Sequence, residues 1–127
     1  MNVENIKFKA KRIDNNTWVE GYFYSECGNS YIIENRQKES MLNRNVTYKV
    51  DPSTVCQFTG LKDRVGMYIF EHDMIHIVGF NYAAEVIWSE GHYAFMVVCD
   101  NEHSYCLHSV IKTCKIERIC NKFDNKK

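Results

Sequence analysis

The sequence predicts an all-β protein, and three observations carry this prediction. The 127 residues include eight Tyr, seven Phe and two Trp, and aromatic side chains favour strands. Apolar and polar residues alternate with a two-residue period in several stretches, as in Ile6–Ala10 and Val46–Val50. Turn residues separate many short stretches of this kind, which is typical of a small barrel or a sandwich. We therefore expect little helix.

The first fifty residues are expected to form strands around one polar loop. The strand near residues 6–11 carries lysines on one face, which suits an edge strand because charge blocks unwanted pairing. Further strands are predicted at residues 18–24, 31–33 and 46–50. Residues 34–45 are almost wholly polar and have no apolar face, so we expect a loop there.

From residue 51 the chain is expected to form short strands separated by turns. The predicted strands cover residues 54–59, 67–71, 73–80, 84–88, 93–99 and 115–119. Gly66 belongs to a hairpin turn within residues 60–66 and is expected to have a positive φ. Residues 103–111 fit either a strand or a short helix. The tail at residues 121–127 is expected to be disordered.

Composition and charge argue against several classes of protein. Sixteen basic and sixteen acidic residues give no net charge, whereas general nucleic-acid binders are basic. No apolar run approaches the roughly 20 residues of a membrane helix, and Met1–Glu4 lack a signal-peptide pattern. We therefore expect a cytoplasmic protein with no membrane partner. Its six cysteines are expected to be reduced thiols, mostly buried.

Candidate catalytic and metal-binding groups are few. Glu71 and Asp73 share a face of a predicted strand, but structural capping or a surface ion pair explains them better than acid–base chemistry does. A second grouping contains zinc-ligand types at Cys99, His103, Cys106 and His108. Its spacing is not that of a recognised zinc site, and no glycine-rich phosphate loop is present. We expect no catalytic residue, no metal and no cofactor.

A long block of the sequence resembles a known family. From Asp51 the chain reads Asp-Pro-Ser-Thr-Val-Cys-Gln-Phe-Thr-Gly-Leu-Lys-Asp, then Gly66 after two residues, then Ile-Phe-Glu-His-Asp-Met-Ile. This block resembles the YopX family of phage and prophage proteins. The segments Ile6–Ala10, Trp18–Tyr22 and Ile116–Asn125 are similar to the start and the end of the family pattern, so the likeness spans nearly the whole chain.

Two glycines of the family pattern are replaced in this chain, by His72 and by Cys120. A left-handed backbone at either position costs a non-glycine residue about 1 kcal/mol or more. The resemblance implies a largely β fold of SH3-like character. We therefore expect an SH3-like small barrel over residues 51–120, preceded by an N-terminal β extension over residues 1–50.

Aromatic and basic side chains are the candidates for a contact surface. Trp18, Tyr22 and Tyr24 share one face of a predicted strand, and an exposed aromatic stripe usually marks a contact surface. The block from Gln57 to Asp63 fits either a binding loop or a plain hairpin turn. The predicted binding residues are Trp18, Tyr22, Tyr24, Lys62, Arg64, Trp88 and Tyr93.

The resemblance implies an oligomeric phage accessory protein and carries no catalytic residue to transfer. We expect a non-enzymatic homo-oligomer in the host bacterial cytoplasm that binds a host protein, either to redirect it or to blunt a defence system. One alternative is an oligomer that sequesters a nucleotide-type signalling molecule by aromatic stacking. Another is nucleic-acid binding through the basic termini, at Lys7, Lys9, Lys11 and Arg12.

Overall fold

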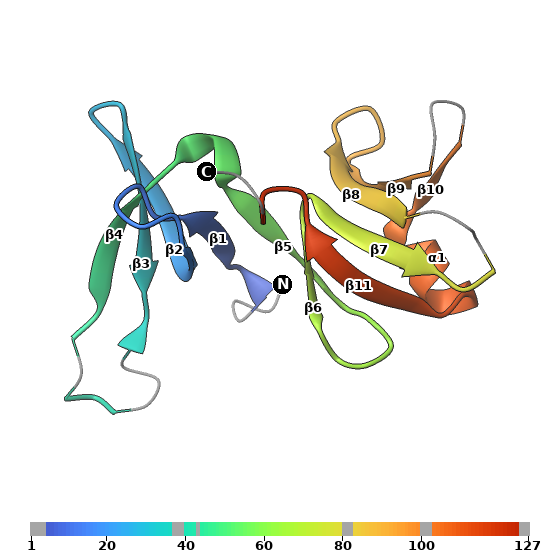
Figure 1. Cartoon of the computed structure of the whole chain (residues 1–127), viewed down its shortest axis with the longest axis horizontal. Coiled ribbons are helices and arrows are strands. Elements are labelled where there is room, and N and C mark those ends of the chain that lie inside the picture. The colour runs from blue at the N-terminus through green and yellow to red at the C-terminus, as the bar shows by residue number, and fades with distance from the viewer. Residues whose placement is uncertain (1–4, 37–39, 43, 80–82, 100–102, 125–127) are drawn as a thin grey trace. The chain divides into compact units, whose positions relative to one another are not determined.

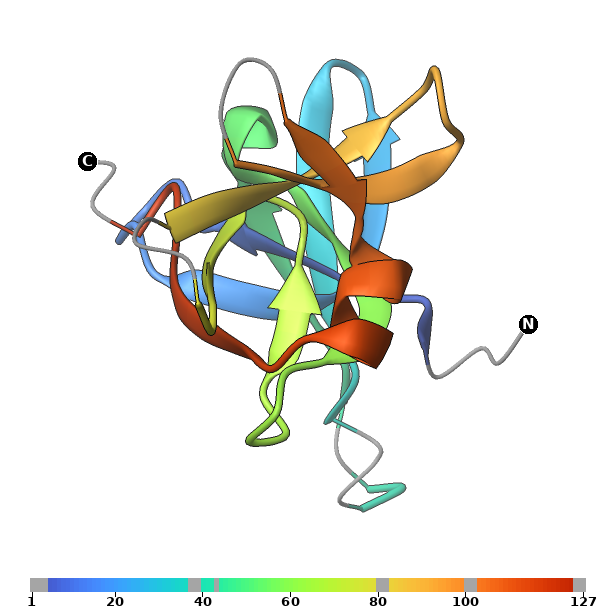
Figure 2. The ribbon, with the colours of Figure 1, turned by 90° about the vertical axis from the view of Figure 1, so that its right-hand side faces the viewer.

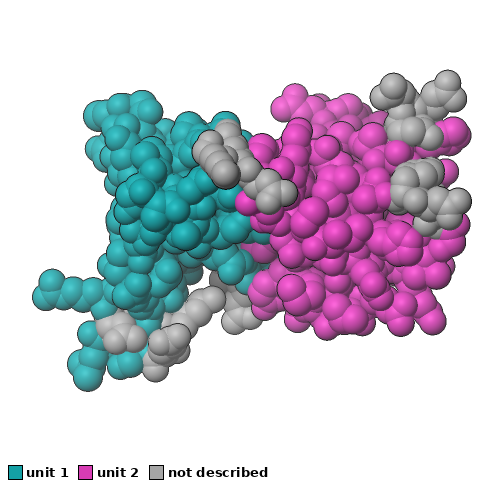
Figure 3. Space-filling model, in the orientation of Figure 1, with its two compact units in different colours: residues 1–58, 126–127 teal, residues 59–125 magenta. Residues whose placement is uncertain are grey.

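The computed structural model describes residues 5–36, 40–42, 44–79, 83–99 and 103–124. The chain divides into two compact units, with the division after Phe58 (Figure 3). Antiparallel strands form both units, which confirms the all-β prediction (Figure 1). Strand β5 (Cys56–Lys62) begins in the first unit and ends in the second.

The first unit is a curled antiparallel sheet. Its further elements are β1 (Phe8–Lys11), β2 (Trp18–Glu26), β3 (Asn29–Glu34), β4 (Val46–Val50) and the 3-10 helix η3 (Pro52–Thr54). The strand order is β4-β3-β2-β1-β5. The Ile13 N–H donates to the Lys49 carbonyl at 3.1 Å, and the Asp51 N–H donates to the Lys11 carbonyl at 2.9 Å. These bonds join the outer edge of β4 to the end of β1.

One face of this sheet carries the core of the first unit. Ala10, Ile32 and Val50 are fully buried there. Gly21 on β2 lies against the backbone of β3, and a Cβ atom at this position would lie 2.0 Å from the Ile33 carbonyl oxygen. Every other residue type would push the strands apart, so the ladder requires glycine here.

The lysine row of β1 is not on an edge strand, so that interpretation was wrong. Strand β1 lies between β2 and β5, and Lys9 and Lys11 are only 7% and 3% exposed. Their ammonium groups lie 4.5 Å and 5.6 Å from the centroid of the Trp18 ring. The aromatic face attracts both cations, which offsets part of the cost of burying them.

The second unit contains a four-stranded meander, formed by β7, β8, β9 and β10. The elements of this unit are β6 (Tyr68–Phe70), β7 (Asp73–Ile77), β8 (Ala83–Ser89), β9 (Ala94–Val98), β10 (Ser104–Cys106), the helix α1 (Leu107–Thr113) and β11 (Ile116–Asn121). Figure 2 shows α1 leading from β10 into β11. The segment at 103–111 that fitted either a strand or a helix therefore contains both. None of the described helices has the length and apolar character that crossing a bilayer requires.

Strand β11 returns to pair with the first strand of the meander, which gives the order β10-β9-β8-β7-β11. No ladder joins β10 to β11 among the described residues, and these residues form two antiparallel sheets without a closed barrel. The SH3-like barrel is therefore not confirmed. The core of this unit contains Ile69, Ile75, Ile77, Ala84, Val86, Val97, Leu107, Val110 and Ile116.

Several local expectations can be compared with the structure. Gly66 has a φ of 89°, as the hairpin turn required. Asn121 is 2% exposed and its side-chain oxygen accepts the Phe123 N–H at 2.9 Å, so the expected disordered tail is ordered through Asp124, and residues 125–127 lie outside the described residues. All six cysteines are free, as expected, but Cys56 alone among them is buried.

Of the two residues that replace glycines of the family pattern, His72 has a positive φ and Cys120 does not. The positive-φ non-glycine residues of the described chain are Asn16, Cys27, His72 and Tyr93. His72 has a φ of 68°, and two backbone bonds hold it there: its N–H donates to the Val86 carbonyl at 2.7 Å, and its carbonyl accepts the Lys122 N–H at 2.9 Å. The surrounding structure therefore imposes a conformation that favours glycine at position 72.

Replacing His72 by glycine and by alanine separates backbone strain from side-chain contacts. Both variants lose the hydrogen bond between the imidazole and Glu85, which is 2.9 Å long. Only the glycine variant relieves the strained φ, so we expect H72G to be more stable than H72A by about 1 kcal/mol. Urea unfolding of the two variants measures the difference. Equal stabilities would show that the backbone at position 72 is unstrained.

Candidate binding surface

The aromatic stripe predicted on β2 is present in the first unit. Trp18, Tyr22 and Tyr24 alternate along the strand and share a face. Tyr22 and Tyr24 are exposed, and Tyr24 stacks on Tyr31 with ring centroids 5.0 Å apart. The Trp18 ring differs because two lysine ammonium groups of β1 lie over it. Those cations occupy the position that a stacking ligand would need.

The predicted basic residues Lys62 and Arg64 lie in the second unit and interact within it. The Lys62 ammonium lies 5.2 Å from the centroid of the Tyr68 ring. Arg64 forms an exposed ion pair with Glu117 at 3.6 Å. Lys62 therefore has its partner on β6, and Arg64 has its partner on β11. Neither cation lies on the β8–β9 hairpin, which carries the predicted residues Trp88 and Tyr93.

Trp88 and Tyr93 lie on one hairpin, formed by β8 and β9. Trp88 pairs with Phe95 across the ladder, and their rings meet edge to face with centroids 5.1 Å apart. Ser89 pairs with Ala94, and a hydrogen bond of 2.9 Å between the Ser89 hydroxyl and the His92 imidazole closes the turn. We name this set of Trp88, His92, Tyr93 and Phe95 the aromatic hairpin.

Tyr93, the last residue of the hairpin turn, combines an exposed ring with a left-handed backbone. Its side chain is 82% exposed, and its φ is 50°, in the left-handed region. That conformation costs a residue with a Cβ atom about 1–2 kcal/mol. An exposed ring recovers little of this cost by burial. Strain of this kind concentrates at functional positions, which makes Tyr93 the leading candidate for a contact residue.

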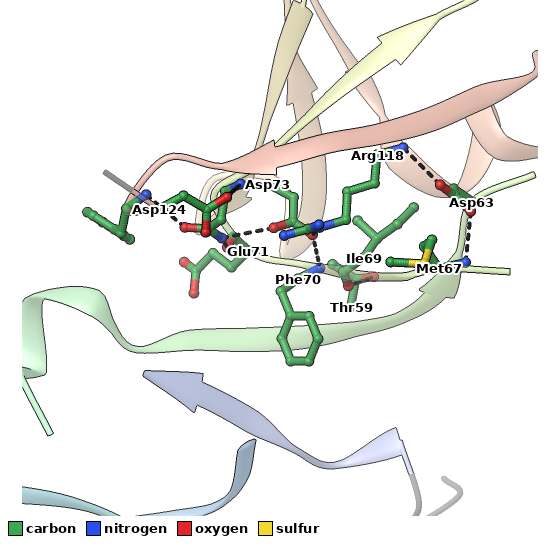
Figure 4. A network of polar contacts seen from close by, with 11 residues as sticks. Thr59, Asp63, Met67, Ile69, Phe70, Glu71, Asp73, Arg118 and Asp124 are labelled. Carbon is green, nitrogen blue, oxygen red and sulfur yellow. Dashed lines mark hydrogen bonds and ion pairs between the residues drawn. The ribbon is translucent and has the colours of Figure 1, made fainter. Parts of the chain in front are cut away.

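The carboxylates at positions 71 and 73 do not form an acid–base pair. Asp73 is fully buried and accepts three hydrogen bonds, from the Phe70 N–H at 2.8 Å, the Arg118 Nε at 3.0 Å and the Asn121 Nδ2 at 2.9 Å (Figure 4). Glu71 is partly exposed and lies 3.7 Å from the His72 ring nitrogen. The buried carboxylate is thus paired and hydrogen-bonded, which is a structural role.

Asp63 has a similar structural role in the block at residues 57–63. Its side chain accepts the N–H groups of Met67 at 2.8 Å and Arg118 at 2.9 Å (Figure 4). It also accepts the N–H of Val65 at 3.0 Å. Burial raises the pKa of Asp63, but these backbone donors together outweigh it and hold the pKa below its usual value. The block therefore shapes the β5–β6 turn and ties it to β11, in agreement with the hairpin interpretation.

A cavity of about 320 Å³ opens beside α1 in the second unit. The thiols of Cys106 and Cys114, at the two ends of the helix, contribute to its lining with Ile77 and Val110. The backbone N–H of Ser109 lowers the pKa of the Cys106 thiol, burial opposes this, and the His108 N–H adds to the lowering. The described lining contains no imidazole or carboxylate that could act as a general base.

The zinc-ligand types of the second unit do not assemble into a site. Among the residues that the structure describes, no group of three or more His, Cys, Asp or Glu side chains is placed to hold a metal ion. Cys99 and His103 instead meet through their backbones, where the Cys99 N–H donates to the His103 carbonyl at 3.1 Å. This bond continues the β9–β10 pairing.

Comparison with known proteins supports the resemblance seen in the sequence. A family model described as YopX protein matches residues 1–127, the whole length of the chain. The chain belongs to the YopX family. In this YopX protein the block from residue 51 to residue 75 supplies both buried carboxylates, Asp63 and Asp73, so its polar residues hold the second unit together. Neither the curated proteins nor the solved structures gave a match.

Sequence reasoning missed two members of the aromatic hairpin, Phe95 and His92. Their roles depend on the pairing of Trp88 with Phe95 and of Ser89 with Ala94, and a register cannot be read from composition. The turn residues at 89–91 were the available signal, because they place a hairpin between two strands. That signal predicts a turn but not which side chains meet across it.

Asp63 makes the stability of this YopX protein dependent on pH. Its pKa is lower in the folded chain than in the unfolded chain, so its contribution is present above the usual carboxyl pKa and is lost as pH falls through the folded value. We expect Asp63→Asn to cost about 1–3 kcal/mol at neutral pH, because its amide nitrogen would face the Arg118 N–H. Urea unfolding at neutral and acid pH should show this cost shrinking in acid; a constant cost would contradict the assignment.

Cys106 should remain reactive at a lower pH than an ordinary thiol. We expect Ser109→Pro to raise the pKa of Cys106, since proline removes the N–H that lowers it and is tolerated in the first turn of a helix. Ser109→Ala, which keeps this N–H, is the control. Peptide mapping after brief iodoacetamide treatment across a pH series gives the apparent pKa. Identical profiles for the two variants would exclude the backbone effect.

Proposed function

We propose that this YopX protein is a non-enzymatic binding protein of phage or prophage origin that engages a protein of its bacterial host through the aromatic hairpin. The observation that carries the proposal is Tyr93, whose ring is 82% exposed on a left-handed backbone. Trp88 on the same hairpin is 40% exposed. Tyrosine and tryptophan dominate the binding energy of protein interfaces, because large rigid rings bury much area at little entropic cost.

The hairpin favours a protein partner over a phosphate-bearing ligand. Strands β8 and β9 and the turn between them contain no lysine or arginine, and Glu85 and Glu90 are acidic. A nucleotide or a nucleic acid carries phosphates that need cationic or amide partners. Stacking on Trp88 or Tyr93 would bring these phosphates toward the exposed Glu90 of the turn. The hairpin thus gives the nucleotide-sequestering alternative no electrostatic support.

The basic residues near the N-terminus also give limited support to nucleic-acid binding. Lys9 and Lys11 are buried over Trp18, and Arg12 binds the Asp14 carboxylate through its Nε at 2.9 Å. The guanidinium of Arg12 also lies 4.5 Å from the Tyr48 ring centroid. These cations have partners within their own unit, so fewer are available to neutralise phosphates than the sequence alone suggests.

The proposed setting follows from the family. YopX proteins are associated with phages and prophages, so we place the partner in the bacterial cytoplasm and expect its capture to redirect it or to blunt a defence. Self-association into a homo-oligomer is part of the same proposal. Pairing of exposed strand edges between copies is the physical route that the fold offers.

Tyr93→Gly separates binding from stability. Glycine relieves the left-handed backbone, so we expect the free energy of unfolding to stay equal or to rise by up to about 1 kcal/mol. Loss of a central tyrosine should lower partner capture by about tenfold or more. The measurements are thermal unfolding of the chain and quantitative mass spectrometry of proteins captured from host lysate by the wild type and the variant.

Tyr24→Ala is the matched control, because Tyr24 is also an exposed tyrosine, at 39%, but lies on β2. We expect its capture profile to equal that of the wild type. A Tyr93→Gly protein that is stably folded and captures the same proteins in the same amounts would refute binding through the hairpin.

A further inference from the structure

The aromatic hairpin lies within a long stretch of the chain that has no lysine or arginine. From Val65 to Ile111 the sequence contains six acidic residues and no lysine or arginine. Three of the acidic residues have partners in the structure: Asp73 binds Arg118, while Glu71 and Glu85 lie against His72. Glu90 is exposed and lies in the turn of the hairpin, between Trp88 and Tyr93 in the sequence.

The cations of the second unit are on other elements. Arg118 lies 3.0 Å from Asp73, and Lys122 lies 4.0 Å from Glu85. Arg64 and Lys62 have the partners described above, on β11 and β6. Lys112 and Lys115 belong to the end of α1 and the segment before β11. The charge of Glu90 on the hairpin is therefore not balanced by a cation of β8 or β9.

Two rings of the hairpin, Trp88 and Tyr93, are exposed at 40% and 82%. Elsewhere in the chain, cations lie over aromatic rings at 4.5 to 5.9 Å, as Arg12 does over Tyr48 and Lys122 over Phe123. Within the described residues, none lies over Trp88 or Tyr93. Phe95 meets the Trp88 ring edge to face. Exposed aromatic rings beside a carboxylate form a suitable site for a guanidinium or ammonium group.

We infer that the segment recognised by the aromatic hairpin is basic: a stretch of a partner protein whose arginine or lysine side chain lies over Trp88 or Tyr93 and pairs with Glu90. This inference rests on the proposed function and adds the chemistry of the partner. Charge complementarity selects such a segment, because an acidic one would be repelled by Glu90. The ring faces contribute additional attraction for a cation.

A Trp18→Phe variant leaves Trp88 as the one tryptophan of the chain, so that its fluorescence reports on the hairpin. The probes are two nine-residue peptides of alternating arginine and glycine, one with every arginine replaced by citrulline, which keeps the shape and removes the charge. We expect the arginine peptide to change Trp88 fluorescence with an affinity at least about fivefold higher than that of the citrulline peptide. Added salt should reduce this preference.

Two further variants in the Trp18→Phe background locate the contact. Glu90→Gln removes the carboxylate and Tyr93→Gly removes the ring, and each should weaken the arginine peptide by about threefold or more while leaving the citrulline peptide unchanged. Glu26→Gln, an exposed glutamate at the end of β2, is the control and should change neither titration. Equal responses to the two peptides, including no response to either, would overturn the inference.

The inference and the proposed function fail in different ways. If host-protein capture depends on Tyr93 but the arginine and citrulline peptides are equivalent, the basic-segment inference is wrong and binding through the hairpin stands. If capture is independent of Tyr93, the proposed function is wrong whatever the peptides do. Support for the inference requires both the Tyr93 dependence of capture and the preference for the charged peptide.

Discussion

The fully buried carboxylate of Asp73 is the constraint on which the second unit depends. A buried charge is costly unless it is paired and hydrogen-bonded, and here it binds a guanidinium, a side-chain amide and a backbone N–H. These three donors come from β11, from the end of β11 and from β6. One side chain therefore fixes the β6–β7 turn against the last strand of the chain. Removing either ionic partner would leave the other as an uncompensated charge, so the turn and the last strand depend on each other.

The block that carries the family resemblance and the proposed binding surface lie in different places in this protein. The block that carries the family resemblance supplies Asp63 and Asp73, which hold turns and strands together. The aromatic hairpin, in contrast, lies after this block, and its Trp88 and Tyr93 side chains are exposed, whereas Asp63 and Asp73 are buried. A family pattern of this kind identifies what the fold requires. The residues that meet a partner have to be found from exposure and backbone strain.

Sequence reasoning predicted the features that depend on local pattern. The alternation of apolar and polar residues predicted a β fold, and Gly66 predicted a turn. The two-residue spacing within β2 predicted that Trp18, Tyr22 and Tyr24 share a face of the strand. It failed where a distant residue decides the outcome. The β1 lysines were assigned to an edge because the Trp18 ring that covers two of them is not visible in their own strand. Arg118 and Asp73 are 45 residues apart, and the left-handed backbone at Tyr93 has no local signature. Trp88 and Tyr93 were named from the sequence as binding residues, and the sequence did not predict the ring contact of Trp88 with Phe95 or the left-handed backbone of Tyr93.

The hydrogen bonds between β1 and β4 in the first unit have a consequence for assembly. The Lys49 carbonyl and the Asp51 N–H, at the outer side of the last strand of that sheet, already bind Ile13 and Lys11. An incoming chain would find these groups occupied, so this half of the strand is a poor template for intermolecular pairing and for fibrillar aggregation. These two hydrogen bonds therefore also restrict where a second copy of the chain can pair its own strand with this sheet.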